Sequence, residues 1–153
     1  MFLLIPSMLH AQDSEQSVEP ISLEKALKLA PTEGKKILVD VYATWCPYCQ
    51  RMHSEVYPSG SVQEAISKYF FWVKIDVEGE EMIKYHGEEM TEAQFAQALE
   101  NTNVPTVYFL NEEGAILGTQ PGYFEEEVFA NLLNFVGSDA YLNQSFQEYT
   151  GDE

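Results

Sequence analysis

The chain has 153 residues, of which 45% are hydrophobic and 13% aromatic, so it suits one globular domain with an ordinary apolar core. It carries 25 acidic and 8 basic residues, a net charge of -17, and the half from Asp76 to Glu153 holds 17 of the acids and one base. Such a surface repels phosphate backbones and anionic headgroups, which disfavours nucleic-acid binding and polybasic membrane binding.

The N-terminal residues 1–11 are similar to the end of a secretory signal peptide. Their apolar residues precede the small residue Ala11, where cleavage is expected, although no Lys or Arg stands before them. A plain apolar tail is the alternative. We expect an exported, periplasmic protein with a flexible polar leader at 12–20, a domain at 21–137 and a C-terminal extension at 138–153.

Helix and strand patterns alternate from the start of the domain. A predicted helix begins at the N-cap Ser22 and ends at Pro31 and Gly34. The run 37–42 is short, β-branched and apolar apart from Asp40, which is typical of a central strand covered on both faces. The next predicted elements are helices at 50–56 and 62–69 and a strand at 70–77.

The second half is predicted in the same way. Residues 78–103 are expected to form a helical connection, because Thr91 and Gln94 fit a capping box. The remaining predicted elements are strands at 106–110 and 115–118, joined as a hairpin, and a helix at 125–136. This order predicts an α/β domain with a mixed central β-sheet flanked by helices.

Cys46 and Cys49 are the only cysteines, and their C-x-x-C spacing after a strand is typical of a redox pair. A structural zinc site needs four ligands, and haem attachment needs histidine where Gln50 stands. If Pro47 occupies the first helical turn, Cys46 lies at the helix N-terminus, where free N–H groups and the dipole stabilise a thiolate. We therefore expect Cys46 to attack a disulfide and Cys49 to resolve the mixed disulfide.

Two further residues invite explanation. His53 could join both cysteines on one helix face and bind copper or zinc, but we favour a solvated side chain, since ligands on one straight helix cannot easily surround an ion.

An acid in a buried strand, such as Asp40, is costly without a partner or a task. Lys74 neighbours Asp40 if the two strands pair in parallel, and Asp40 then either moves the Cys49 proton through water or serves as a structural acid.

These motifs closely resemble the thioredoxin superfamily. Residues 39–49 resemble its strand, buried acid and active-site helix, and residues 73–77 resemble its next strand, with Lys74 at the family's buried lysine. Val104-Pro105-Thr106 resembles the loop whose proline is cis and faces the disulfide, and Gly122 matches the glycine before the final helix. The finer likeness is to exported bacterial thioredoxin-like proteins of the SoxW type and to the C-terminal domain of the transmembrane disulfide reductase.

The resemblance implies a thioredoxin fold with an N-terminal helix, a helical insertion before the cis-Pro loop and a C-terminal helical tail. The catalytic residues that it implies are Cys46, Cys49, Asp40 and Lys74. The residues that it implies for substrate binding are Trp45, Pro47, Tyr48, Val104, Pro105 and Thr106. No cofactor or metal is implied.

The implied activity is thiol-disulfide exchange. We expect a monomeric, exported reductase of disulfide-containing client proteins, recharged by a membrane thiol electron donor. The dipeptide Pro47-Tyr48 resembles that of glutaredoxins, whereas thioredoxin has Gly-Pro, so the redox direction stays open. The alternatives are a disulfide-donating oxidase and a copper-binding or substrate-holding module that uses Cys46, Cys49 and His53.

Overall fold

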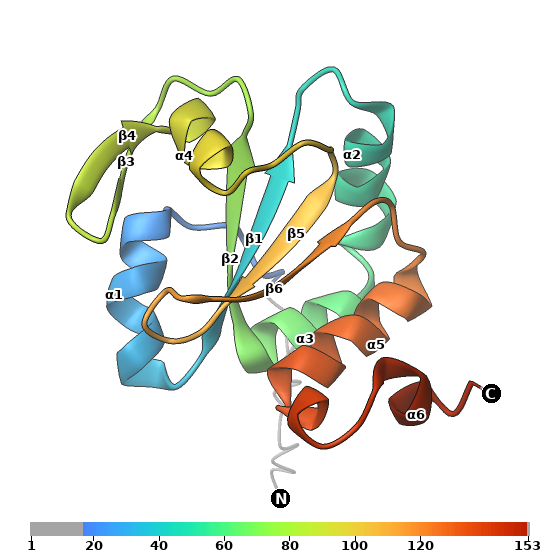
Figure 1. Cartoon of the computed structure of the whole chain (residues 1–153). Helices are drawn as coiled ribbons and strands as arrows, with labels where there is room; N and C mark the ends of the chain where they lie inside the picture. The colour runs from blue at the N-terminus through green and yellow to red at the C-terminus, as the bar shows by residue number, and fades with distance from the viewer. Residues whose placement is uncertain (1–16, 153) are drawn as a thin grey trace, which may run out of the picture.

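A computed structural model describes residues 17–152 of the chain (Figure 1). The predicted signal-peptide remnant at 1–11 and the first part of the predicted leader, 12–16, lie outside the described residues. Among the residues described, none of the helices has the length and apolar character needed to cross a membrane. The chain already contacts the domain at Val18, whose N–H donates to Gln63 Oε1 over 2.6 Å.

The structure alternates helices and strands before a helical C-terminus. The first half contains α1 (Leu23–Glu33), β1 (Lys36–Tyr42), α2 (Pro47–Arg51), the π-helical turn η1 (Met52–Val56), α3 (Gly60–Tyr69) and β2 (Phe70–Asp76). The second half contains β3 (Met82–Tyr85), β4 (Glu88–Thr91), α4 (Glu92–Ala98), β5 (Thr106–Leu110), β6 (Ile116–Pro121), α5 (Glu126–Gly137), the 3-10 turn η2 (Ala140–Leu142) and α6 (Phe146–Thr150).

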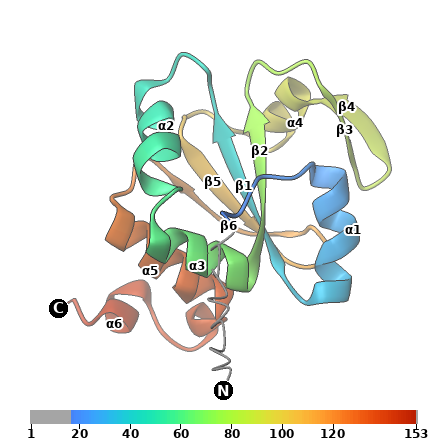
Figure 2. The ribbon, with the colours of Figure 1, turned by 180° about the vertical axis from the view of Figure 1, so that it is seen from behind.

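The main sheet has four strands in the order β2-β1-β5-β6. β1 pairs with β2 in parallel and with β5 antiparallel, and β6 is antiparallel to β5. Figures 1 and 2 show α1 and α4 on one face of this sheet and α2, α3 and α5 on the other. The predicted α/β class with a mixed sheet is therefore confirmed.

Strand β1 is buried on both faces, as its almost continuous apolar sequence predicts. Ile37, Val39 and Val41 contribute to the core beneath α1 and α4, and Leu38 contributes to the core beneath α3 and α5. Asp40 therefore points into the second of these cores, because successive side chains of a strand point to opposite faces. The same face carries the active-site helix.

Helix α1 continues through Pro31, so the prediction that Pro31 ends it was wrong. Pro31 is exposed and lies three residues before the C-cap, so its missing N–H affects only the end of the helix. The helix ends at Gly34, whose φ of +63° favours glycine and whose N–H donates to the Ala30 carbonyl. Ser22 is the N-cap, as predicted, and accepts from the Lys25 N–H.

The predicted helical connection at 78–103 is wrong in its first half, which contains the β3–β4 hairpin. His86 and Gly87 form its two-residue turn with φ values of 49° and 85°. Positive φ at both residues is the backbone conformation that two-residue hairpin turns favour. Tyr85 anchors the hairpin through an edge contact with Phe95 and a 2.7 Å hydrogen bond to the Gly114 carbonyl. Only α4 is helical, and it begins with the predicted Thr91–Gln94 capping box.

The C-terminal helical extension packs on the end of α5, which confirms the predicted helical tail. Phe135 contacts the rings of Tyr141, Phe146 and Tyr149. The buried Lys36 at the start of β1 forms a 2.9 Å ion pair with Asp139. The extension is therefore joined to the domain by an aromatic cluster and by a charge pair.

Candidate active site

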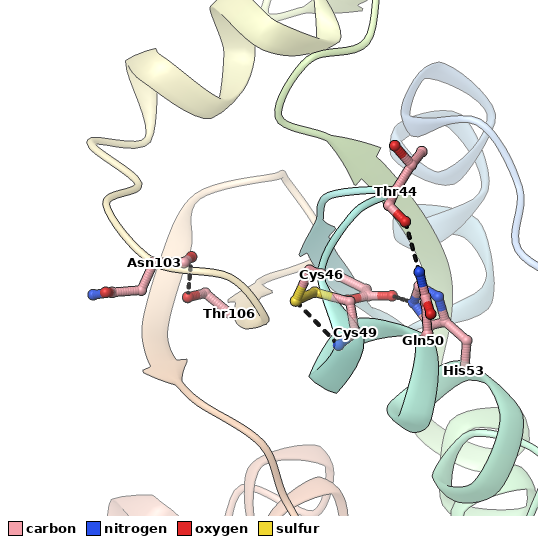
Figure 3. The surroundings of a disulfide bond; sticks show 8 residues. Thr44, Cys46, Cys49, Gln50, His53, Asn103 and Thr106 are labelled. Atoms are coloured by element: carbon pink, nitrogen blue, oxygen red, sulfur yellow. Dashed lines mark hydrogen bonds and ion pairs between the residues drawn. A yellow bond between two sulfur atoms is a disulfide. The ribbon is translucent and has the colours of Figure 1, made fainter.

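Cys46 and Cys49 form a disulfide at the N-terminus of α2, with their Cα atoms 5.3 Å apart (Figure 3). Cys46 is the N-cap of the helix and Pro47 occupies its first turn, as the sequence predicts. The Cys49 N–H donates to the Cys46 sulfur over 3.2 Å. In the reduced form this N–H and the positive end of the helix stabilise negative charge on Cys46.

The disulfide lies in the protein surface beneath an exposed aromatic pair. Cys46 is 4% exposed and Cys49 is 1% exposed, whereas Trp45 and Tyr48 are 61% and 59% exposed. Burying these two rings against a partner would remove a large apolar area from water. Of the two cysteines, Cys46 is the more exposed.

The loop before β5 packs beside the cysteines, as Figure 3 shows for Asn103 and Thr106. The Val104–Pro105 peptide bond is cis, the isomer that the resemblance implies. Val104 packs against the cluster formed by the two cysteines and Ala43. Thr106 Oγ1 donates to the Asn103 carbonyl over 2.7 Å, which ties the two ends of this loop together.

The same loop is tied to the end of β6. The Gly122 N–H donates to the Pro105 carbonyl over 2.8 Å, and its φ of +104° explains why glycine stands there. Beyond Gly122, the Tyr123 ring lies 5.8 Å from the Tyr48 ring, and the Arg51 guanidinium lies 5.0 Å from the Tyr123 ring centre. The sequence analysis missed Tyr123 and Arg51, because only the tertiary fold brings β6 beside α2.

Asp40 is 1% exposed, and its partner is His53, whose Nε2 lies 2.5 Å from Asp40 Oδ2. The predicted parallel register is correct, because Lys74 stands opposite Asp40. The expected partnership of the two charges is not formed: Lys74 Nζ lies over the Tyr42 ring, 4.6 Å from its centre. The lysine side chain thus contacts Tyr42, near the end of β1, and Asp40 contacts His53 of the helical turn η1 instead.

The prediction that His53 is a solvated helix residue was wrong. Its side chain is 20% exposed, and its ring lies edge-on to Tyr42 at 5.1 Å and tilted against Tyr57 at 5.6 Å. The helix changes to a π-helical turn at Met52, which adds a residue to the turn and alters the direction of the side chains that follow. Sequence held one indication of this contact, namely that the buried Asp40 needed a partner.

His53 therefore faces Asp40 rather than completing a metal site with the cysteines. In the part of the chain that the structure describes, no three or more His, Cys, Asp and Glu side chains are grouped so that they could hold a metal ion. The described geometry thus offers no support for the copper-binding alternative.

Acidic side chains act on two aromatic residues near the site, Tyr42 and Trp45. Burial raises the pKa of Tyr42, and the charges of Asp76 and Glu92 raise it further. Burial also raises the pKa of Glu92, although the hydrogen bond from the Asp76 N–H lowers it. Trp45 Nε1 donates to Glu78 over 3.2 Å, so one carboxylate of this region touches the exposed tryptophan directly.

A helix-capping C-x-x-C disulfide beside a cis-proline loop, on a mixed sheet flanked by helices, defines a thiol-disulfide oxidoreductase of thioredoxin fold. Residues 23–137 match the family model for the thioredoxin-like domain, and the chain belongs to this family.

Two solved structures show the same fold. A thioredoxin-fold protein from Helicobacter pylori superposes with a TM-score of 0.63 at 19% identity, covering 78% of this chain and 80% of that one. A thioredoxin from Thermus thermophilus gives the same TM-score at 24% identity and covers 78% and 87% of the two chains.

The curated relatives include proteins named thiol:disulfide interchange protein DsbD. The protein from Pseudoalteromonas atlantica is 26% identical over 127 residues, which cover 79% of this chain and 20% of the relative. The protein from Actinobacillus pleuropneumoniae is 28% identical over 113 residues, covering 70% of this chain and 17% of the relative. The chain thus spans about a fifth of the length of these relatives.

Proposed function

We propose that this chain is an exported reductase of protein disulfides, with Cys46 as the attacking thiolate and Cys49 as the resolving thiol. The observation that carries the proposal is the position of Cys46 as N-cap of α2, where the Cys49 N–H reaches its sulfur. A thiolate at this position is stabilised near neutral pH and lies nearer the surface than Cys49. Both properties suit the sulfur that meets the client first.

The reaction transfers two electrons to the client. The Cys46 thiolate attacks one sulfur of the client disulfide, a mixed disulfide forms, and the other client sulfur leaves as a thiolate. Cys49 then loses its proton, its thiolate attacks the Cys46 sulfur, and the second client thiolate leaves as the Cys46–Cys49 bond forms. A membrane dithiol donor returns two electrons to the protein for the next turnover.

The client binds across the cysteines in this proposal. Trp45, Pro47 and Tyr48 contact it from the helix side, and Val104, Pro105 and Thr106 contact it from the loop. The backbone of Val104 pairs with an extended client segment in the manner of strand addition. Asp40 accepts the proton of Cys49, and the positive charge of Lys74 near Tyr42 contributes to the electrostatics of the site.

Export and the membrane donor are supported by two separate observations. The apolar residues before Ala11 resemble a signal peptide, and the curated relatives are named as interchange proteins in which the matching segment is about a fifth of the whole. The proposal assigns residues 1–11 to the export signal, 12–20 to a leader, 21–137 to the catalytic domain and 138–153 to an appended extension. The catalytic unit acts as a monomer.

Reduction of insulin by the pre-reduced protein tests the activity. We expect stoichiometric precipitation of the insulin B chain, and no precipitation with the Cys46→Ser variant, which keeps the fold but lacks the attacking sulfur. A wild-type protein that leaves insulin oxidised would contradict the proposal.

Export is tested separately by fusing residues 1–20 to a bacterial alkaline phosphatase that lacks its own signal. The fusion should be active only when it leaves the cytoplasm, and replacing Leu3 and Leu4 by Asp should abolish the activity. Equal activity of both fusions would argue against an export signal in this segment.

A disulfide-donating oxidase is the second candidate. Its support comes from the same N-cap position, since a strongly stabilised Cys46 thiolate makes the reduced form more stable and the disulfide more oxidising. The dipeptide Pro47-Tyr48 does not decide between reductase and oxidase. The reduction potential of the Cys46–Cys49 couple decides between them.

A further inference from the structure

The resolving step requires a proton to leave a closed interior. Cys49 and Asp40 are each 1% exposed, so neither side chain can exchange a proton freely with bulk water. A proton that passes from Cys49 to Asp40 in the proposed reaction still has to reach solvent. The route out must begin at a group that touches Asp40.

His53 is that group. Within residues 17–152, the Asp40 carboxylate has one hydrogen-bond partner, His53 Nε2 at 2.5 Å. The imidazole is 20% exposed, and its other nitrogen, Nδ1, takes part in no hydrogen bond within the same residues. One nitrogen of the ring thus contacts the buried acid, while the partly exposed side chain gives the ring access to solvent.

We propose that His53 relays the proton of the resolving step between Asp40 and solvent, an inference that rests on the proposed thiol-disulfide function. Before this step the pair holds two protons, one in the contact between Nε2 and Asp40 Oδ2 and one on Nδ1. The Cys49 proton passes through water to the other oxygen of Asp40, and the ring then releases its Nδ1 proton to solvent. The net change is one proton moved from Cys49 to water, with no electrons passing through the ring.

The surroundings of the ring suit this task. The His53 ring makes a T-shaped contact with Tyr42 from β1 at 5.1 Å and a tilted contact with Tyr57, which follows η1, at 5.6 Å. Burial raises the pKa of Tyr57 well above its usual value, so this hydroxyl keeps its proton and does not compete as a base. Burial raises the pKa of Tyr42 as well, so both tyrosines beside the ring stay neutral.

The other charges near the path lie on different elements. From β2, Lys74 Nζ lies over the Tyr42 ring, 4.6 Å from its centre, and Asp76 acts on the same tyrosine together with Glu92 of α4. On the helix of His53 itself, Arg51 and Glu55 pair with each other at 3.0 Å on the exposed side. Among the described residues, none of these charged groups forms a hydrogen bond with His53. The hydrogen bond of its ring is the one to Asp40.

The resolving step can be timed with Ellman's reagent in a stopped-flow experiment. The reduced protein releases one thionitrobenzoate when Cys46 attacks the reagent, at a rate proportional to its concentration. It releases a second when Cys49 resolves the mixed disulfide, at a rate that the reagent concentration does not change. Cys49→Ser removes the second phase and identifies it.

Two variants test the relay. His53→Gln can still donate a hydrogen bond to Asp40 but cannot carry a proton, so the second phase should slow about tenfold or more while the first phase is unchanged. His53→Ala should slow the same phase, and added imidazole should restore its rate in proportion to concentration. A purely structural histidine would not give this rescue, because free imidazole repairs proton transfer and not packing.

His86→Asn is the matched control. His86 is exposed in the β3–β4 turn, and asparagine tolerates its positive φ, so both phases should keep the wild-type rates. Urea unfolding of His53→Gln, which should remain cooperative, separates a slow second phase from a damaged fold.

The outcomes distinguish the inference from the function on which it rests. A His53→Gln second phase at the wild-type rate, or His53→Ala without imidazole rescue, would overturn the relay while wild-type insulin reduction remained intact. If the wild-type protein lacks both release phases and leaves insulin oxidised, the proposed function itself fails.

Discussion

The backbone N–H of Cys49 points at the sulfur of Cys46 across 3.2 Å, so the second cysteine of the pair supports the first through its main chain. The same helical turn places the Cys49 side chain at 1% exposure behind Cys46. The two sulfurs are thus inequivalent in the structure, and the proposed difference in their roles rests on this inequivalence.

Trapping experiments should show that inequivalence directly. Cys49→Ser should accumulate mixed disulfides with client proteins, because Cys46 still attacks but nothing resolves the product. Cys46→Ser should trap none, because the remaining thiol is buried. Non-reducing gels measure both, and equal trapping by the two variants would show that the roles are assigned wrongly.

Asp40→Asn tests the proposed base. Turnover in the insulin assay should fall by about tenfold or more between about pH 6 and pH 8, because the amide cannot accept the Cys49 proton. The fold should be as stable as wild type or more so, since a buried charge is removed while the amide oxygen can still accept from His53. Glu55→Gln, which changes an exposed acid of the neighbouring helical turn, is the control and should leave turnover unchanged. An unchanged rate in Asp40→Asn would leave the acid a structural role only.

Tyr57→Phe should stabilise the protein. Within residues 17–152 the buried Tyr57 hydroxyl has no hydrogen-bond partner, and leaving such a group dry costs about 1 to 3 kcal/mol. Urea unfolding at neutral pH should show a gain of about 1 kcal/mol. Tyr108→Phe is the matched control with the opposite sign, because the Tyr108 hydroxyl bonds to Asn101 over 3.2 Å. A loss of stability in Tyr57→Phe would refute the assignment.

The same variant carries a pH dependence. Burial, and then the charge of Asp40, raise the pKa of Tyr57 in the folded state well above 10.0, whereas the unfolded tyrosine titrates at about 10. Above about pH 10 the folded state therefore binds more protons than the unfolded state, and stability falls as the pH rises. Tyr57→Phe removes this part of the loss, so its advantage over wild type should grow in alkaline urea titrations. A constant difference across that range would mean that the hydroxyl reaches solvent.

The contact between α3 and α5 predicts an unusual glycine effect. In most helices Gly→Ala stabilises by up to about 1 kcal/mol, but a methyl group at Gly137 would overlap Cβ and the ring of Tyr69. Gly137→Ala should therefore lower the free energy of unfolding by about 1 to 3 kcal/mol. Gly60→Ala, at the first residue of α3 with open space around it, should be neutral or slightly stabilising. Similar urea midpoints for the two variants would contradict this account of the packing.

Local patterns in the sequence predicted the elements whose signals are local. The apolar run of β1, the cap at Ser22 and the placement of Cys46 before Pro47 depend on neighbouring residues, and the structure has all three. Lys74 was expected beside Asp40 if the two strands pair in parallel, and the structure has that register.

The contacts that the sequence analysis missed depend on tertiary structure. His53 contacts Asp40 from the π-helical turn that begins at Met52, and no residue pattern in the sequence predicted that turn. The β3–β4 hairpin was missed because each strand has only four residues and β4 begins with two acids of low β propensity, although the His86-Gly87 pair was a turn signal. In both cases packing against distant residues decided the local structure.

The reduction potential of the Cys46–Cys49 couple tests the central claim most directly. Equilibration of the protein with glutathione buffers of known ratio, followed by alkylation and mass measurement, gives this potential. We expect a reducing couple near the value of about -270 mV that thioredoxin has. A potential near the value of about -120 mV that a strong disulfide donor has would contradict the account and would make the protein an oxidase.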